Sequence, residues 1–319
     1  MQNVRLLSAL FLAMFAPGAW TLDYPTRPVR LIVGLTPGAG TDITARDIAI
    51  RLTDKFKQTV LVDNRAGAGG SIAAEITAGA APDGHTLMMA TGTYLIHPLM
   101  HKARYDAVRD FAPVTQAVSL PLILVVNSAV PAGTLSELIA LARGNPGTIN
   151  FATAGSGSFA HLTGELFKIM ARINLIHVPY KGSAAAYPDL LAGRVQMLFP
   201  SIASALPHIK TGRLRGLAVT TRTRSKSSPE YPSMDEAGVT GFDVTQWYGV
   251  LAPAGTPRPV INRLQSEIAE ILRQPKFIAQ LATEGSDPVA NSPDEFAQYI
   301  RSEIDKWNKV IKQTGIRGE

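Results

Sequence analysis

The stretch Ala154-Gly155-Ser156-Gly157-Ser158-Phe159-Ala160-His161 separates a strand-like segment, residues 149–153, from a helix-like segment, residues 159–171. Glycines allow the backbone to turn sharply and allow a ligand to approach it closely. The helix that follows directs its unpaired N–H groups and the positive end of its dipole toward the turn. The stretch therefore predicts a strand–turn–helix unit whose turn is a candidate anion site. A solvent-exposed loop with a serine cap is the alternative for the same residues.

Strand-like and helix-like patterns alternate on both sides of this unit. The expected strands are residues 29–33, 59–62, 86–90, 122–127, 149–153, 175–178, 195–199, 215–220 and 245–252. The expected helices are residues 41–56, 71–80, 134–143, 159–171, 184–192, 257–273, 276–284 and 293–314. A Thr134-x-x-Glu137 capping box marks the start of the third helix. Strands that alternate with helices favour an α/β fold of parallel sheets with helices on both faces.

Three consecutive helices end the chain, and they need an existing sheet to pack against. We therefore predict that the chain leaves a first domain, residues 23–124, builds a second, residues 125–249, and returns to the first with residues 250–319. A second glycine-rich turn, Thr36-Pro37-Gly38-Ala39-Gly40-Thr41-Asp42, joins a strand to a helix in the first domain. Ligands bind beyond the carboxyl ends of strands in open α/β sheets, so the two turns predict two jaws of one cleft.

The N-terminus is typical of an export signal. Arg5 precedes an apolar run over residues 6–16, and Pro17-Gly18-Ala19 ends that run with small residues. The run is too short to span a membrane. We expect residues 1–22 to be a cleaved signal peptide, which predicts a periplasmic protein; an uncleaved anchor is the alternative.

Composition excludes several classes of function. The chain has 319 residues, 46% of them hydrophobic and 18% charged, which is enough for two folded domains. It has no cysteine, which excludes thiol catalysis and cysteine-bound metals. The formal charge of +6 is spread out, and its densest part, residues 213–226, contains no aromatic side chain. The glycine-dense stretch at 64–71 lacks the spacing of a nucleotide-binding loop. We expect no metal, no cofactor and no nucleic-acid partner.

Serine and histidine near the central turn raise the alternative of a secreted serine hydrolase. Ser156 and Ser158 lie close in sequence to His161, and Glu165 follows on the same helical face. A nucleophilic triad needs a base that is oriented by an acid. Here the nucleophile, the base and the acid would all lie at the start of one helix, which is an unusual arrangement for a triad.

Two other histidines have a spacing that can bind a metal. His97 and His101 are four residues apart, but no glutamate follows the first histidine and Pro98 lies between them. We expect packing or surface roles for both.

A series of short motifs occurs in order along the mature chain. They are residues 24–30 (YPTRPVR), 37–46 (PGAGTDITAR), 64–70 (NRAGAGG), 82–87 (PDGHTL), 155–167 (GSGSFAHLTGELF), 177–182 (HVPYKG), 206–210 (LPHIK) and 252–257 (APAGTP). In this order they resemble the Bug-type periplasmic receptors of tripartite tricarboxylate transporters, and the resemblance covers essentially the whole mature chain.

This resemblance implies a two-domain Venus-flytrap α/β fold of the type II periplasmic binding protein class. It also implies a receptor without catalysis that hands a small carboxylated solute to membrane transporter subunits. In such proteins, backbone amides and ordered waters at facing loops hold the ligand carboxylate. The candidate ligand contacts are Thr36, Gly38, Ala39, Gly40, Thr41, Asp42, Thr91, Thr93, Ala154, Gly155, Ser156, Gly157, Ser158, His161, Gly182, Ser183, Ala184 and Asp189.

The identity of the ligand stays open at this point. Ala39, residues 34–36 and Ala185 depart from residues that are common in the family, and amino acids, di- and tricarboxylates and aromatic carboxylates are all candidates. Asp42 and Asp189 are candidates to bind the ammonium group of an amino acid; helix capping is the alternative for Asp42. We expect a monomer. The effector-sensing domain of a regulator can share this type of fold, but the export signal and the lack of a DNA-binding module argue against it.

Overall fold

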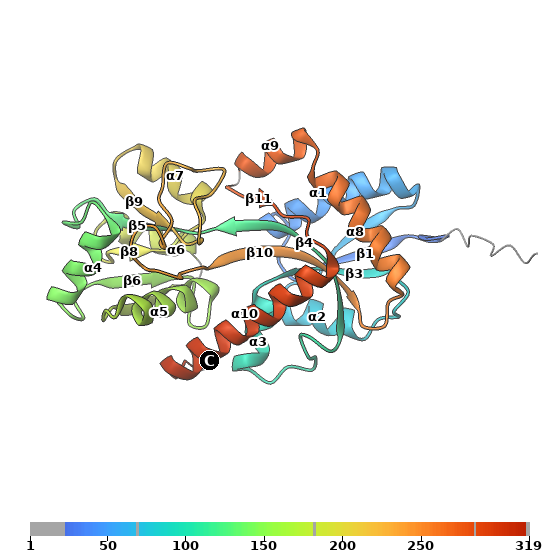
Figure 1. Cartoon of the computed structure of the whole chain (residues 1–319), viewed down its shortest axis with the longest axis horizontal. Coiled ribbons are helices and arrows are strands. Elements are labelled where there is room, and N and C mark those ends of the chain that lie inside the picture. The colour runs from blue at the N-terminus through green and yellow to red at the C-terminus, as the bar shows by residue number, and fades with distance from the viewer. Residues whose placement is uncertain (1–22, 68–69, 181–182, 284, 317–319) are drawn as a thin grey trace, which may run out of the picture.

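The computed structural model describes residues 23–67, 70–180, 183–283 and 285–316. The predicted signal peptide, residues 1–22, lies outside them. The chain forms two β-sheets, each flanked by helices, and these sheets belong to two domains (Figure 1). In the described part of the chain, none of the helices has the length and apolar character needed to cross a membrane.

The first sheet has six strands in the order β11-β4-β10-β3-β1-β2. Its strands are β1 (Val29–Val33), β2 (Val60–Asn64), β3 (Thr86–Thr91), β4 (Phe111–Pro121), β10 (Thr245–Pro253) and β11 (Asp287–Pro288). The helices of this part are α1 (Gly40–Phe56), α2 (Ser71–Ala78), α3 (Thr93–Met100), α8 (Arg258–Leu272), α9 (Pro275–Thr283) and α10 (Pro293–Thr314).

The second sheet has five strands in the order β7-β6-β8-β5-β9. Its strands are β5 (Ile123–Asn127), β6 (Asn150–Thr153), β7 (Ile176–Pro179), β8 (Met197–Leu198) and β9 (Leu214–Val219). The helices of this part are α4 (Leu135–Gly144), α5 (Phe159–Ala171), α6 (Ser183–Leu191) and α7 (Ile202–Lys210).

The prediction of parallel sheets is only partly correct. β1 runs parallel to β2 and β3, and β6 runs parallel to β7 and β8. β10 is antiparallel to both β3 and β4, and β5 is antiparallel to β8 and β9. The reason lies in the path of the chain, because β4 leads out of the first sheet toward the second and β10 leads back in the opposite direction (Figure 1).

Alternating apolar residues supply a core on each face of each sheet. In β1, Leu31 and Val33 belong to one cluster of buried side chains, and Ile32 belongs to the cluster on the other face. The same alternation places Leu124 and Ile123 of β5 in different clusters. Side chains of successive strand residues point to opposite faces, so this pattern needs helices on both sides.

Helix α10 packs on both domains. Its first half contributes Phe296 and Ile300 to a core of the first sheet, and its second half contributes Trp307 and Val310 to a core of the second. Figure 1 shows α10 running from the first sheet toward α5. The prediction that the C-terminal helices pack on the first domain therefore needs a correction, because the apolar stripe of α10 is long enough to reach both.

Candidate functional site

Two glycines and a serine cap shape the turn between β6 and α5. Gly155 and Gly157 have φ values of +132° and +71°, which residues with a Cβ rarely adopt. The Oγ of Ser158 accepts the backbone N–H of His161 at 3.2 Å and so caps α5. The N–H of Ser158 donates to the carbonyl of Gly155 at 3.2 Å. The predicted strand–turn–helix unit is present, with its serine cap.

Several backbone donors of this turn have no partner among the residues that the structure describes. Among the described residues, no acceptor is found for the N–H groups of Ser156, Phe159 and Ala160. Phe159 and Ala160 lie in the first turn of α5, where N–H groups lack intrahelical acceptors and the dipole is positive. Ser156 and Ala160 line the cavities described below. Such donors can bind a carboxylate without a cationic side chain.

A stacked pair of histidines, with His161 buried and His177 partly buried, lies beneath the turn. The Nδ1 of His161 accepts the N–H of Gly157 at 3.0 Å, and its ring stacks on that of His177 with centroids 3.7 Å apart. The Nε2 of His177 lies 2.6 Å from the Oγ1 of Thr153. Burial and the nearby Lys168 cation lower the pKa of His161 to about 4. Burial and the neighbouring His161 likewise lower the pKa of His177 to about 4. Both rings are neutral at pH 7 and support the turn from behind.

A cavity of about 740 Å³ lies between this turn and α3. Its described lining consists of Leu35, Thr93, Ile96, His97, Met100, His101 and residues 154–158. Thr93 and the whole turn were predicted as ligand contacts, and the structure brings them together. The hydroxyls of Thr91 and Thr93 lie 2.6 Å apart, so Thr91 supports Thr93 from the end of β3. The volume suits a small organic ligand.

A second cavity, of about 430 Å³, shares Thr93, Ala154 and Ser158 with the first. Its other described lining residues are Leu122, Phe159, Ala160, Ala184, Tyr187, Phe199, Pro200, Ser201, Ser204 and Gln246. Ser201 caps α7 and Ala184 lies in the first turn of α6, so the N-termini of α5, α6 and α7 meet here. Of this lining the sequence predicted Ala154, Ser158, Thr93 and Ala184.

The glycine-rich turn of the first domain, residues 36–42, lies at the start of α1. The carboxylate of Asp42 in this turn is already hydrogen-bonded within the protein. The Asp42 side chain accepts from the backbone N–H of Gly38 at 2.9 Å, from Arg46 Nε at 3.0 Å and from Asn64 Nδ2 at 2.9 Å. Burial raises the pKa of Asp42, but these hydrogen bonds outweigh it and the net pKa is lowered. Leu35 lines the larger cavity; Thr36, Gly38, Ala39, Gly40, Thr41 and Asp42 are not among the described lining residues of either cavity.

The segment around α6 carries the remaining predicted contacts. The carboxylate of Asp189 accepts from Tyr180 Oη at 2.7 Å and from Arg194 at 2.8 Å, so it too is engaged within the protein. Ser183 begins α6 and Ala184 lines the smaller cavity. Gly182 lies outside the described residues.

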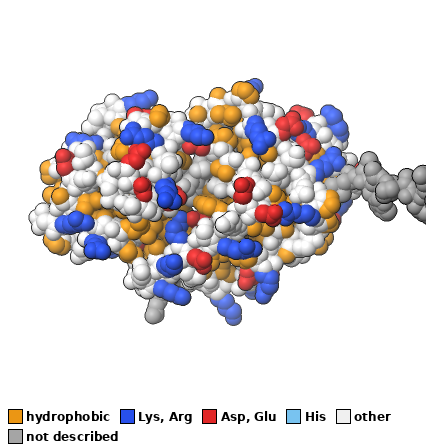
Figure 2. Space-filling model, in the orientation of Figure 1, with side chains coloured by type: hydrophobic (Ala, Val, Ile, Leu, Met, Phe, Trp, Pro, Cys, Tyr) orange, Lys and Arg blue, Asp and Glu red, His pale blue; other side chains and the backbone are white. Residues whose placement is uncertain are grey.

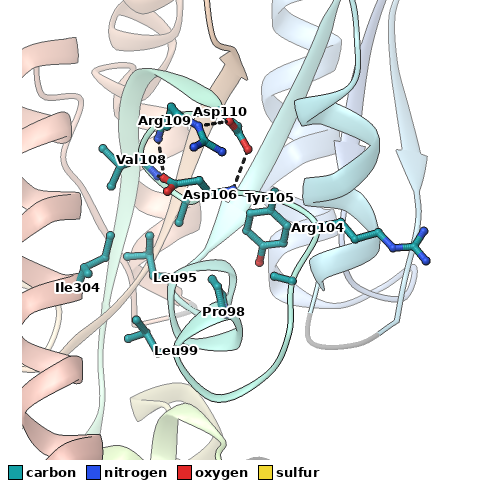
Figure 3. A pocket seen from close by; sticks show the side chains of 12 residues that line it. Leu95, Pro98, Leu99, Arg104, Tyr105, Asp106, Val108, Arg109, Asp110 and Ile304 are labelled. Carbon is teal, nitrogen blue, oxygen red and sulfur yellow. Dashed lines mark hydrogen bonds and ion pairs between the residues drawn. The ribbon is translucent and has the colours of Figure 1, made fainter.

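A third cavity, of about 470 Å³, lies on the first domain between α3, the segment after it and α10. Figure 3 shows Arg104 extending away from it and Arg109 held by Asp110, at 3.1 Å. The carboxylate of Asp106 accepts the N–H groups of Val108 and Arg109. The polar groups at this rim thus bind one another, and no predicted contact lies there.

The hydrolase alternative is not supported by the geometry. The Nδ1 of His161 is occupied by a backbone N–H, and its Nε2 lies 3.9 Å from Glu165. The Oγ of Ser158 accepts from a backbone N–H, and neither Ser158 nor Ser156 forms a hydrogen bond with the imidazole in the described part of the chain. A nucleophile–base–acid relay is therefore not assembled.

His97 of α3 stacks on His101, which follows the helix as its C-cap. The rings of His97 and His101 lie 4.7 Å apart. Within the ranges that the structure covers, no group of three or more His, Cys, Asp or Glu side chains is arranged to hold a metal ion.

Residues 44–316 match the tripartite tricarboxylate transporter family receptor. The chain belongs to this family. It is 37% identical to Protein BugT of Bordetella pertussis over 297 residues, which cover 92% of this chain and 91% of BugT. The family is one of periplasmic solute-binding receptors, as the motif order predicts.

Solved receptors of this family resemble the chain closely. A Rhodopseudomonas palustris protein solved with adipate is 35% identical, has a TM-score of 0.78 and matches over 92% of this chain and 99% of its own. MatC from the same organism, solved with bound malate, is 30% identical with a TM-score of 0.73 over 90% of this chain and 100% of its own. Adipate and malate are both small carboxylates.

Sequence reasoning missed two thirds of the described residues that line the two cavities. The missed lining residues are Leu35, Leu122, Ile96, His97, Met100, His101, Phe159, Ala160, Tyr187, Phe199, Pro200, Ser201, Ser204 and Gln246. Ser201 carries a signal that could have been recognised, because a serine immediately before residues 202–206, which are apolar except for Ser204, is typical of a helix cap. The others follow from how the two domains face each other, which no local pattern encodes.

Proposed function

We propose that this protein is a periplasmic receptor that captures a small carboxylate between its two domains and delivers it to membrane transporter subunits without catalysis. The observation that carries the proposal is the β6–α5 turn, whose unpaired N–H groups face a cavity closed from the other side by α3. Each helix-end donor contributes about 0.3–1 kcal/mol, or up to about 2 kcal/mol when partly buried. Several donors together support micromolar affinity, about −8 kcal/mol.

The domain boundaries, the export signal and the monomeric state are part of this proposal. We take the first domain as residues 23–124 and 250–319 and the second as residues 125–249. β4 and β10 both cross between the domains, and they pair as far as Pro121 and Thr245. We use the end of this pairing to choose the position of the hinge. We place the hinge just beyond that pair, at Leu122 on one crossing and Val244 on the other. A signal peptide in residues 1–22 directs the protein to the periplasm.

Adipate and malate, which the two solved relatives bind, define the ligand class from which the proposal starts. Amino acids and aromatic acids are also candidate ligands, and these candidates are predicted from the sequence alone. The ammonium-binding role of Asp42 and Asp189 is the weakest part of the amino-acid prediction, since both carboxylates already accept hydrogen bonds inside the protein.

Substitution of Gly157 by valine tests the assignment of the turn. Gly157 has φ +71°, so a side chain strains the turn, and a Cβ there would lie 2.9 Å from Met100 Cε, so the end of the Met100 side chain must move within the cavity. The wild type should bind a carboxylate stoichiometrically without consuming it, measured by calorimetry and by analysis of the recovered ligand. Gly157→Val should lose this binding and keep a cooperative unfolding transition.

Gly212→Val is the matched control. Gly212 has φ +70°, and a Cβ added there would have nothing within 4 Å, so valine brings the same backbone strain away from the cavities. It should bind ligand as the wild type does. Unchanged affinity in Gly157→Val, or turnover of the ligand by the wild type, contradicts the proposed function.

A further inference from the structure

We infer that the preferred ligand of this receptor is a monocarboxylate with an apolar body, and not a dicarboxylate or an amino acid. The inference rests on the proposed function and concerns the same site. It follows from how polar and apolar groups are divided between the two walls of the larger cavity.

The β6–α5 turn supplies the Ser156 N–H to the larger cavity, together with the hydroxyl groups of Ser156 and Ser158. Phe159 and Ala160, at the start of α5, line the adjoining smaller cavity. The facing side of the larger cavity carries the side chains of Leu35, Ile96 and Met100, which pack against the hydrophobic cores of the protein. A carboxylate on the donor side therefore directs the rest of a ligand toward an apolar wall.

No described residue that lines either cavity is a lysine, an arginine, an aspartate or a glutamate. A second carboxylate against Leu35 and Met100 would lose its hydration without gaining a cation or a row of N–H donors. An ammonium group would likewise find no carboxylate there, since Asp42 and Asp189 are hydrogen-bonded within the protein.

His97 and His101 add two imidazole rings to the lining of the larger cavity, and the Nδ1 of His97 is buried without a hydrogen-bond partner among the described residues. His97 and His101 stack with centroids 4.7 Å apart. Burial and the neighbouring His101 lower the pKa of His97, which keeps that ring uncharged at neutral pH. Stacked rings are good contacts for an aliphatic chain or an aromatic ring.

Three six-carbon acids that differ only at the far end test the inference. Hexanoate ends in a methyl group, adipate in a carboxylate and 6-aminohexanoate in an ammonium group. Titration calorimetry at pH 7.5 should give hexanoate an affinity at least about tenfold higher than either of the others. Tighter binding of adipate or 6-aminohexanoate overturns the inference and leaves the proposed receptor function intact. Binding of none of these acids, nor of malate or phenylacetate, contradicts the receptor function itself.

Leu35→Lys tests whether the side of the cavity formed by Leu35, Ile96 and Met100 determines which of the three acids binds most tightly. A lysine there supplies the missing cation, so hexanoate should bind about tenfold more weakly and adipate more tightly than to the wild type. Leu61→Lys is the matched control, because Leu61 is 59% exposed on β2 of the same domain. It should leave all three affinities unchanged. An unchanged order of affinities in Leu35→Lys contradicts the role of this wall.

Discussion

The His161 imidazole can accept the Gly157 N–H only while its Nδ1 is unprotonated, so the ligand turn depends on a neutral ring. The folded-state pKa of His161 is lowered to about 4, against an unfolded value of about 6.5. The unfolded chain therefore takes up a proton as the pH falls through about 6.5, whereas the folded chain does not until about 4. The stabilisation by the neutral ring is complete above the unfolded pKa and is lost as the pH falls between the two values.

We predict that the free energy of unfolding falls by about 3 kcal/mol between pH 7 and pH 4 because of His161. Urea denaturation at closely spaced pH values measures this loss. In His161→Asn, the amide oxygen can still accept the Gly157 N–H. The free energy of unfolding of this variant should therefore depend less steeply on pH between about pH 6.5 and 5. His208→Asn is the control, since His208 stacks on Tyr187 outside the cluster. If the free energy of unfolding depends on pH in the same way in the wild type and in His161→Asn, His161 is not the source of the loss.

Two helix caps, one at the ligand turn and one away from it, allow effects on stability and on ligand binding to be measured separately. Ser158 caps α5 at the ligand turn, and Thr134 caps α4 with the reciprocal bonds of a capping box. Loss of either cap should lower the free energy of unfolding by about 0.5–2 kcal/mol. Ser158→Ala should also weaken ligand binding several-fold, because the cap fixes the first turn of α5. Thr134→Ala should leave affinity unchanged, and calorimetry beside denaturation distinguishes the two. Equal effects on affinity would contradict the role of the Ser158 cap.

The elements that the sequence predicts well are those with strong periodicity or an explicit cap. The box at Thr134 and Glu137 correctly marks the start of α4. Helix α3 was missed because it has only eight residues and contains Pro98, which disfavours helix by local criteria. Strand β4 was missed over eleven residues, since Pro113 and Pro121 interrupt its pattern. Its pairing with β10 on one side and β11 on the other outweighs those prolines.

At the scale of the whole molecule, the site is assembled from segments that are distant in the chain. Leu35, α3, the β6–α5 turn and Ser201 converge on the cavities, although more than 160 residues separate the first from the last. Local reasoning could predict the donor turn from its glycines. It could not predict the apolar wall, because that wall exists only where the two domains face each other.

Charged side chains of both signs are spread over the face of the molecule that Figure 2 shows. Figure 2 shows basic and acidic side chains interspersed over the face in view, without a continuous basic patch. Many of the exposed cations have an acidic partner, as in the pair of Arg27 with Asp83 and the pair of Arg258 with Asp294.

Helix α10 constrains how the two domains can move. Its Trp307 ring meets Phe159 of α5 edge-on at 5.4 Å, and Lys306 donates to the carbonyl of Asp243 at 2.8 Å. The α10 contacts lie beside the strands that cross between the domains. Any closing motion must therefore keep or rearrange the contact between Trp307 and Phe159, which lines the smaller cavity.

Ligand-driven closure of the two domains is the last prediction, and the absence of cysteine makes it measurable. Leu61 in the first domain and Ile176 in the second are 59% and 47% exposed, so the double variant Leu61→Cys/Ile176→Cys carries two unique spin labels. Pulsed electron resonance should show a different, narrower distance distribution once ligand joins the two walls. Leu61→Cys/Ile72→Cys, with both labels in the first domain, should not change. If ligand binds and the interdomain distribution stays as it was, closure is not the mechanism.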